Sequence, residues 1–297
     1  MANKILLAGA SGTIGSALAS FLQASGYEVV ALQRKSRDKP YFWDPEQGIL
    51  QGSLEGFYAV INLAGHSVAS GRWSKKTKRK IWSSRIETTK LLVESLKKLK
   101  HPPKVFLSAS AIGLYGHSQD QNIAEDHPAG SGFLAEVCTA WEHEAMQATK
   151  FGLRVVLLRF GIVLTPQGGA LKKMLPLFKL GLGGNLGSGN QWMSWIGLED
   201  VLGIILMTLR QEKISGPLNV VSPTPITNKE FTHILAKVLK RPAVFHVPAP
   251  ILRLLLGEMA EETLLASSHI SPEKLLQTHY PFRHTDLEQL LRSLLKT

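Results

Sequence analysis

The first 34 residues constrain the fold of this chain more than any other stretch. Apolar residues 4–8 are followed at once by the glycine-rich segment 9–15. Apolar positions at helical spacing then run from 17 to 22, and a second apolar run covers residues 28–32. This order predicts a strand, a glycine turn at the N-terminus of a helix, and a second strand. Such a βαβ unit is typical of proteins that bind the pyrophosphate of a dinucleotide.

Three glycines of the turn have separate physical roles. Gly9 permits a tight turn out of the strand, Gly12 permits the backbone to approach a phosphate, and Gly15 permits the helix to lie close to the sheet. The free N–H groups at the helix start, with the positive end of the helix dipole, then attract the anion. A tight turn in an α/β protein that binds no nucleotide stays open as the alternative.

Further apolar runs alternate with helical patterns along the chain. They cover residues 58–63, 104–108 and 154–159. This alternation predicts an α/β fold built on a doubly wound parallel sheet, in which ligands bind beyond the carboxyl ends of the strands. The segments expected at that edge are 9–15, 33–35, 63–65, 108–115 and 160–163.

Glycine becomes dense beyond residue 165. Gly168-Gly169 and the segment 181–189 bracket a short apolar helix at 170–180, which predicts a mobile lid or backbone held close to a ligand. Residues 75–100 are expected to form a long helical region, and residues 192–196 a strand. A further helix is expected from Thr227 to Leu239, with Thr227 as its N-cap and Glu230 at the capping-box position.

Composition limits the location and the partners of the protein. The single cysteine excludes an intrachain disulfide and a CxxC metal site, so no metal ligands are assigned. No basic leader precedes the first strand, and no apolar stretch reaches the ~18–20 residues of a membrane span. We therefore expect a cytoplasmic protein with no membrane partner.

The net charge of +11 raises the question of a nucleic-acid partner. Much of this charge lies between Arg72 and Lys104. The stretch carries no nucleic-acid-binding signature, and Trp73 and Trp82 are its only aromatic residues, too few for a stacking platform. We interpret it as a solvated helix face that partly serves an anionic cofactor, and nucleic acid is not expected.

The end of the second strand indicates which dinucleotide is bound. NAD-preferring sites place a carboxylate there, which binds the ribose 2′-hydroxyl. This chain has Gln33-Arg34-Lys35-Ser36-Arg37 instead. The absence of an acid and the three basic residues favour NADP(H), with Arg34 as the ligand of the 2′-phosphate. A merely exposed basic turn is the alternative.

With these motifs the chain resembles the extended short-chain dehydrogenase/reductases, also called the NAD-dependent epimerase/dehydratase superfamily. It is most similar to the branch labelled "epimerase family protein", which has a short C-terminal domain of unknown function. The resemblance covers nearly the whole chain and rests on the glycine turn, Asn62-Leu63-Ala64-Gly65, Ser84-Arg85-Ile86-Glu87, Ser110-Ala111-Ile112-Gly113-Leu114-Tyr115-Gly116, Trp141-Glu142, Arg159-Phe160-Gly161-Ile162, Gly183-Gly184, Ser194-Trp195-Ile196-Gly197 and Gly257-Glu258.

This resemblance implies a Rossmann domain with a smaller, mostly helical C-terminal lobe. The Rossmann domain would cover residues 1–165 and be rejoined by about 186–225, with 166–185 as a glycine-bracketed insert and 226–297 as the substrate lobe. Arg85 is implied to reach a phosphate or a substrate carboxylate, with a helix-surface ion pair as the alternative. The implied cofactor-binding residues are Gly9, Ser11, Gly12, Thr13, Ile14, Gly15, Arg34, Leu63, Ala64, Arg85 and Ile162.

The superfamily's catalytic Tyr-x-x-x-Lys pair is missing. Its two positions fall at about Leu134 and Cys138, and neither side chain can do the work of a tyrosine acid or a lysine cation. Candidate substitutes are Ser110, with Ser108 as a neighbouring alternative, and Tyr115. Lys172 and Lys173 in the insert are candidate cations.

Two functions remain open on this basis. The first is an NADP(H)-dependent oxidoreductase or epimerase-like enzyme that acts on an unknown small-molecule substrate with displaced acid and base residues. The second is a non-catalytic NADP(H)-binding redox sensor or scaffold, which the missing Tyr/Lys pair favours. A homodimer is left open.

Overall fold

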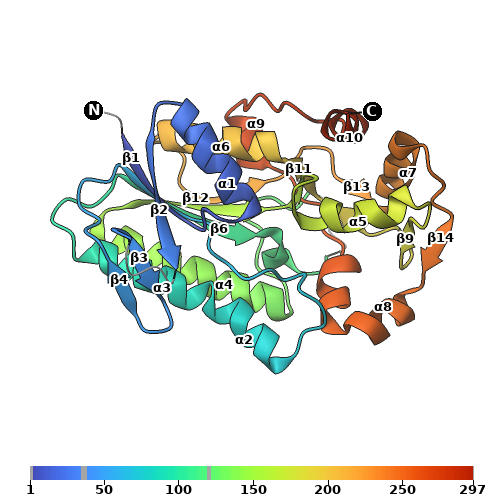
Figure 1. Cartoon of the computed structure of the whole chain (residues 1–297), viewed down its shortest axis with the longest axis horizontal. Coiled ribbons are helices and arrows are strands. Elements are labelled where there is room, and N and C mark those ends of the chain that lie inside the picture. The colour runs from blue at the N-terminus through green and yellow to red at the C-terminus, as the bar shows by residue number, and fades with distance from the viewer. Residues whose placement is uncertain (1–2, 35–38, 119–121, 297) are drawn as a thin grey trace.

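The computed structural model describes residues 3–34, 39–118 and 122–296. Its centre is an eight-stranded sheet, parallel except where β4 pairs antiparallel with β3 (Figure 1). The predicted doubly wound parallel sheet is therefore confirmed. In spatial order the strands are β12 (Gly216–Val220), β7 (Arg154–Phe160), β6 (Val105–Ala111), β5 (Ala59–Asn62), β1 (Lys4–Ala8), β2 (Glu28–Arg34), β3 (Phe42–Asp44) and β4 (Ile49–Gln51).

The central strands are buried on both faces, which explains their continuous apolar sequences. In β1, Ile5 pairs with Val29 of β2 on one side and with Ala59 of β5 on the other. Strand order reverses at β1, because β2 lies on one side of it and β5 on the other. Such a reversal opens a crevice at the carboxyl ends of the strands, where ligands bind in this class of fold.

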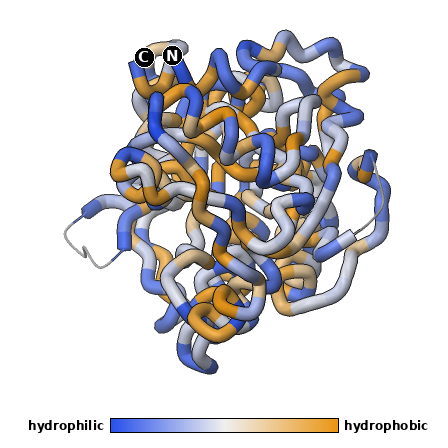
Figure 2. Tube along the Cα trace, turned by 90° about the vertical axis from the view of Figure 1, so that its right-hand side faces the viewer, coloured by the Kyte–Doolittle hydropathy of each residue, from blue (hydrophilic) through white to orange (hydrophobic). Residues whose placement is uncertain are grey.

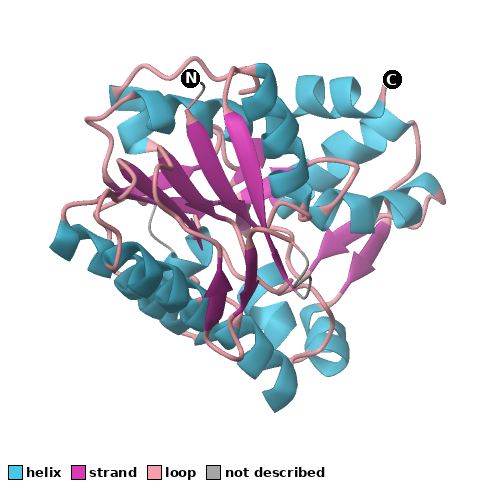
Figure 3. Ribbon diagram, turned by 60° about the vertical axis from the view of Figure 1, so that its left-hand side comes forward, coloured by secondary structure: helices cyan, strands magenta, loops and turns pink. Residues whose placement is uncertain are grey.

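Helices cover both faces of the sheet (Figures 1 and 3). On one face, α1 (Thr13–Ala24) and α6 (Leu198–Arg210) pack on the strands through apolar side chains such as Leu18 and Ile204. On the other face, α3 (Ile86–Lys97) contributes Leu92 and Leu96 to a second core, and α4 (Phe133–Met146) packs beside it.

The predicted helical region over residues 75–100 is divided in the structure into α2 (Lys75–Ser83) and α3, with a break between them. The break lies at Ser84 and Arg85, whose side chains bond to the loop after β5. The backbone N–H of His66 donates to Ser84 Oγ over 2.9 Å, and Arg85 Nη1 donates to the carbonyl of His66 over 2.9 Å. These contacts turn the chain toward the sheet edge and separate the two helices.

The C-terminal lobe lies beside the end of the sheet at the right of Figure 1. Its helices α5 (Gly169–Lys179), α7 (Asn228–Leu239) and α10 (Leu287–Leu295) pack around a core that includes Trp195 and Phe231. The expected cap of α7 is present as a complete capping box of Thr227 and Glu230. The remaining helical elements are α8 (Ala249–Leu256), a π-helical turn at Ala260–Leu264 and α9 (Glu273–Gln277), with 3₁₀ turns at Ile112–Tyr115 and Gln147–Phe151.

Three two-stranded ribbons lie outside the main sheet. They pair β8 (Ile162–Leu164) with β11 (Trp195–Gly197), β9 (Gly184–Leu186) with β14 (Phe245–Val247), and β10 (Trp192–Met193) with β13 (Ile226–Thr227). The expected strand over 192–196 is thus divided at Ser194. Its hydroxyl donates to the carbonyl of Ser268 and accepts from the N–H of Ile270, so the two halves pair with different partners. The predicted domain boundaries stay a prediction.

None of the helices formed by residues 3–34, 39–118 and 122–296 is both long enough and apolar enough to traverse a bilayer.

Candidate functional site

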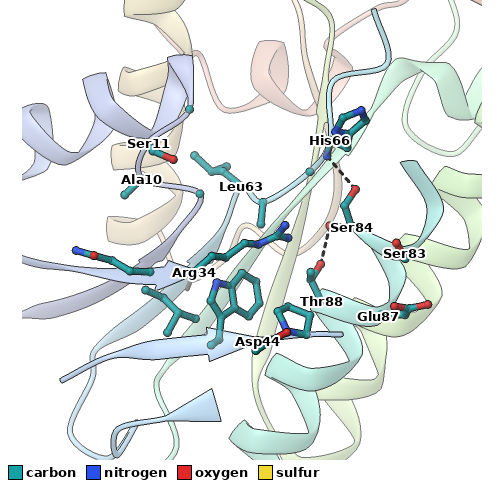
Figure 4. Close-up of a pocket in the computed structure, with 18 of the residues that line it drawn as sticks. Ala10, Ser11, Arg34, Asp44, Leu63, His66, Ser83, Ser84, Glu87 and Thr88 are labelled. Carbon is teal, nitrogen blue, oxygen red and sulfur yellow. Dashed lines mark hydrogen bonds between the residues drawn. The ribbon is translucent and has the colours of Figure 1, made fainter. Parts of the chain in front are cut away.

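The crevice at the strand reversal contains a pocket of about 900 Å³ (Figure 4). Four parts of the chain form its walls: the glycine turn, the end of β2 with the β3–β4 connection, the loop after β5, and the facing ends of α2 and α3. The lining residues are 9–12, 31–34, 43–46, 63–66, Lys80, Ser83, Ser84, Glu87 and Thr88. The predicted convergence at one sheet edge is confirmed, because β1, β2, β5, β6 and β7 are parallel neighbours whose carboxyl ends share that edge. Of the predicted segments, those at the ends of β1, β2 and β5 line the pocket.

The glycine turn is packed so closely that side chains would not fit at two positions. A Cβ on Gly15 would lie 2.1 Å from the carbonyl oxygen of Gly9 and 2.9 Å from the Cα of Ala10. Gly9 has φ +83°, and its Cβ would lie 2.7 Å from the backbone of Leu63. The glycines therefore bring the start of α1 and the loop after β5 against the same turn.

Gly12 differs from these two, because a Cβ there would meet only the Gly9 carbonyl, at 3.3 Å. It is the N-cap residue of α1, and no side chain of the described residues caps this helix end. The N–H groups of the first turn, which begins Thr13-Ile14-Gly15, are therefore available to an anion in the pocket.

Arg34 ends β2 and lines the pocket, as the sequence predicted for a cofactor contact. Its guanidinium carbon lies 5.6 Å from the centroid of the buried Trp43 ring, a cation–π stacking geometry (Figure 4). This contact leaves the N–H groups of the guanidinium available for hydrogen bonds. Lys35 and Arg37, the other basic residues of the predicted cluster, lie outside the described residues.

Lys80 on α2 and His66 also line this pocket, although the sequence analysis did not assign them to it. Burial lowers the pKa of His66, and the nearby cations Lys80, Arg85 and Arg34 lower it further. Three positive side chains therefore act on one imidazole, which indicates a positive potential at the mouth of the pocket. Lys80 belongs to the basic run that the sequence shows, but only the fold reveals that this lysine faces the crevice.

Two carboxylates at the pocket, those of Asp44 and Glu87, have local structural roles. Asp44 Oδ1 accepts hydrogen bonds from the backbone N–H groups of Glu46 and Gln47, at 3.1 and 3.3 Å, and thereby closes the β3–β4 turn. Glu87 lies in the first turn of α3, where the helix dipole favours a negative charge. No carboxylate stands at the end of β2, the position that would repel a 2′-phosphate.

Leu63 and Ala64 line the pocket as the resemblance implies, together with Gly9, Ser11 and Gly12. Five other implied contacts are not among the lining residues: Thr13, Ile14 and Gly15, which begin α1, and Arg85 and Ile162. Ile162 begins β8, where its N–H donates to the carbonyl of Ser194. Arg85 holds the α2–α3 break and stacks over Trp141, with 5.2 Å from its guanidinium carbon to the ring centroid. Their cofactor roles stay predictions.

Ser110 and Tyr115, the predicted catalytic residues, both belong to a buried polar network. Ser110 Oγ donates to Glu142 Oε1 over 2.6 Å, and Glu142 also pairs with Arg159. The Tyr115 hydroxyl donates to Asn219 Oδ1 and accepts from Arg159 Nη1, both over 2.7 Å. Tyr115 is 1% exposed, and burial raises the pKa of its hydroxyl. These contacts favour a structural role for both side chains, and their catalytic role stays a prediction.

The positions expected to carry the Tyr/Lys pair lie on α4. The N–H of Leu134 donates to Glu262 Oε2 over 2.7 Å, and Glu262 Oε1 accepts from Phe133 at the same distance, so this glutamate caps α4. That cap joins residues 128 or more positions apart, so no local sequence signal predicts it. Cys138 is buried, and burial raises the pKa of its thiol to about 12, so it is neither a nucleophile nor a cation at neutral pH.

The glycine-bracketed insert contacts the loop after β5 and the start of α1. The Lys173 ammonium donates to the carbonyl of Ala69, which lies in the loop after β5, while Lys172 is exposed. Gly168 lies against the side chain of Thr13. Across residues 3–34, 39–118 and 122–296, no group of three or more His, Cys, Asp or Glu side chains is placed to hold a metal ion.

Comparison with known proteins gives consistent matches along the whole chain. Residues 5–221 match the model of the NAD dependent epimerase/dehydratase family, and residues 247–294 match a domain of unknown function, DUF1731. The chain is 38% identical over 295 residues to the epimerase family protein Mb2239 of Mycobacterium bovis, covering 98% of this chain and 97% of that protein. It is 33% identical to the human epimerase family protein SDR39U1, over 98% of this chain and 99% of that one.

A solved structure is similar over the same length. The crystal structure of human SDR39U1 (isoform2) with NADPH superposes with a TM-score of 0.90 at 31% identity, covering 99% of both chains. Structures of sugar-nucleotide epimerases and dehydratases superpose at 18–20% identity and show a common fold.

Proposed function

Because the chain belongs to the NAD dependent epimerase/dehydratase family, we propose that its crevice binds NADP(H). The observation that carries this proposal is the 900 Å³ pocket, which joins the uncapped start of α1 to the basic end of β2. A pyrophosphate would lie on the N–H groups at the start of α1, next to Gly12. The adenosine would lie between the end of β2 and the loop after β5, beside Leu63 and Ala64.

Arg34 would hold the 2′-phosphate of this cofactor, and Lys80 would add a second positive charge from the opposite wall. The contact with Trp43 restrains the Arg34 side chain, and its planar guanidinium suits two parallel hydrogen bonds to one phosphate. The NADPH bound to human SDR39U1 supports the same cofactor in this chain. NADH lacks the 2′-phosphate and would leave both cations without their anion.

We predict that Arg34→Ser weakens NADPH binding about 10- to 100-fold, because charge-assisted hydrogen bonds contribute about 1.5–3 kcal/mol. NADH affinity should stay within about twofold, since Arg34 contacts only the 2′-phosphate. Isothermal titration of both cofactors measures the two effects. Arg210→Ser, an exposed arginine on α6, is the matched control and should alter neither. Equal losses of affinity for NADPH and NADH would contradict the role of Arg34 as the ligand of the 2′-phosphate.

We further propose that the protein is an oxidoreductase or epimerase-like enzyme of unknown substrate. A bound nicotinamide supplies hydride transfer, while the protein must orient the substrate and move its proton. With Leu134 and Cys138 at the usual acid and cation positions, the proton would pass through another group, such as a bound water or the substrate itself. Steady oxidation of NADPH with members of a panel of carbonyl compounds would support this activity.

A non-catalytic function is favoured by the two residues of α4 that stand at the usual acid and cation positions. Neither Leu134 nor Cys138 can transfer a proton at neutral pH, and the candidates Ser110 and Tyr115 are engaged in the buried network. A non-catalytic NADP(H)-binding redox sensor or scaffold needs none of these groups. Tight NADPH binding with no turnover on any member of the panel would favour this function over the enzyme.

A further inference from the structure

Helix α8 exposes an apolar face that the proposed cofactor site does not use. Its residues Ile251, Leu254 and Leu255 are 46%, 73% and 62% exposed. They follow an i, i+3, i+4 spacing, so they lie together on one side of the helix. On the other side Leu252 is buried, and Leu256 packs against the cluster around Trp73. The helix thus has one apolar face packed in the protein and a second apolar face in solvent. The exposed side chains form a contiguous patch, whereas single exposed leucines are common on protein surfaces.

The most basic helix of the chain lies beside this face. Arg72 Nη1 donates to the carbonyl of Leu254 over 2.7 Å, and Lys78 pairs with Glu258 just after α8 at 2.8 Å. Figure 1 shows α8 near α2 at the lower side of the molecule, and Figure 2 shows apolar turns beside hydrophilic ones at that lower end. Helix α2 contains no acidic residue and exposes Lys75, Lys76 and Arg79.

The acidic residues near α8 do not cancel this charge. Glu258 is paired with Lys78, and Glu261 is paired with Arg253 at 2.7 Å. Glu262 is directed inward, where it caps the N-terminus of α4. The solvent side of α2 and α8 therefore combines an aliphatic face with unpaired lysines and arginines.

We propose that this α8–α2 surface, made of the exposed side chains of Ile251, Leu254, Leu255, Lys75, Lys76 and Arg79, binds an anionic lipid bilayer. Aliphatic side chains flanked by lysine and arginine suit the boundary between acyl chains and negative headgroups. Trp82, 36% exposed, follows Lys75 and Arg79 at helical spacing and has the ring that membrane interfaces favour.

Charge argues against the other occupants of such a face. Two copies of this chain would oppose the same lysines, and the repulsion would weaken the dimer. Protein interfaces are depleted in lysine, whereas this surface exposes Lys75 and Lys76 beside its aliphatic face. Helix α8 has 8 residues and would lie in the membrane plane. The sequence-based expectation of no membrane partner rested on span length, which does not bear on surface binding.

Flotation of the whole chain with vesicles tests the proposal. Vesicles of phosphatidylcholine with 30% phosphatidylglycerol (about the anionic content of a charged leaflet) should carry the protein, and pure phosphatidylcholine should carry at least about tenfold less. Leu254→Ser with Leu255→Ser should lower binding at least about tenfold, since two exposed leucines lose their burial. Lys75→Glu with Lys76→Glu should do the same, and 0.5 M salt should release the wild type.

Matched variants distinguish vesicle binding by this surface from non-specific adsorption of the protein to vesicles. Leu276→Ser removes an exposed leucine on α9, and Lys97→Glu with Lys98→Glu reverses two exposed charges at the end of α3. Both should bind vesicles like the wild type, and all variants should keep their melting temperature and NADPH affinity. Absence of vesicle binding at low salt would overturn the proposal, as would equal losses in the matched variants. Capture of an acidic protein in place of vesicles would also overturn it.

Discussion

Replacing Arg159 with methionine should lower the free energy of unfolding by about 3–5 kcal/mol, the usual effect of breaking a buried ion pair on one side. Arg159 and Glu142 form two parallel hydrogen bonds of 2.8 and 2.9 Å with side chains that are 6% and 11% exposed. The substitution would leave the Glu142 carboxylate buried with Ser110 as its remaining partner. It would also remove a donor from the Tyr115 hydroxyl. Denaturant unfolding measures the loss.

Two further variants distinguish this network from a general loss of charge. Arg283→Met removes an arginine whose pair with Glu199 is 66% and 58% exposed, and it should cost under about 1 kcal/mol. Arg159→Met combined with Glu142→Leu should be more stable than Arg159→Met alone, because no unpaired charge stays buried. A double variant that is less stable than both single variants would contradict the role given to this pair.

Replacing Gly15 with alanine should cost about 3 kcal/mol of stability, at the upper end of overpacking effects. The new methyl would lie 2.1 Å from the Gly9 carbonyl oxygen, and backbone atoms are its nearest neighbours, so no flexible side chain can yield. Relief requires the turn to move away from α1, which displaces the amides proposed to hold the pyrophosphate. NADPH affinity should therefore fall about 100-fold as well, measured by calorimetry alongside thermal unfolding.

Gly12→Ala is the matched substitution in the same turn. Its φ is −76°, and its new methyl would meet one atom at 3.3 Å, so stability should change by under about 1 kcal/mol. The methyl would project where a phosphate must approach, and NADPH affinity should still fall at least tenfold. Unchanged affinity in Gly12→Ala would place the pyrophosphate elsewhere.

The glycine turn and the parallel sheet were predictable because they depend on local chemistry. Gly9, Gly12 and Gly15 allow the turn to pack closely against the start of the helix. Continuous apolar runs such as residues 4–8 suit strands that are buried on both faces. The basic end of β2 could be predicted for the same reason, since Arg34 is the last residue of that strand.

Structural features that depend on contacts between residues far apart in the sequence could not be predicted from local patterns. The break between α2 and α3 depends on Ser84 and Arg85 reaching His66, which lies in the loop after β5. Periodicity over residues 75–100 gives no sign of that loop. In the sequence Lys80 cannot be distinguished from the neighbouring lysines, and only the folded structure shows that it lines the pocket. Ser110 and Tyr115 have the residue types of catalytic groups, but their partners Glu142 and Asn219 are 32 and 104 positions away.

The most direct test of the central claim is the ratio of NADPH to NADH dissociation constants for the unmodified chain, measured by calorimetry at one pH and low salt. The claim is that the crevice is built for a 2′-phosphate held by Arg34 and Lys80. It predicts that NADPH binds at least about tenfold more tightly than NADH, since one charge-assisted phosphate contact suffices for that difference. Equal binding, or tighter binding of NADH, would contradict it.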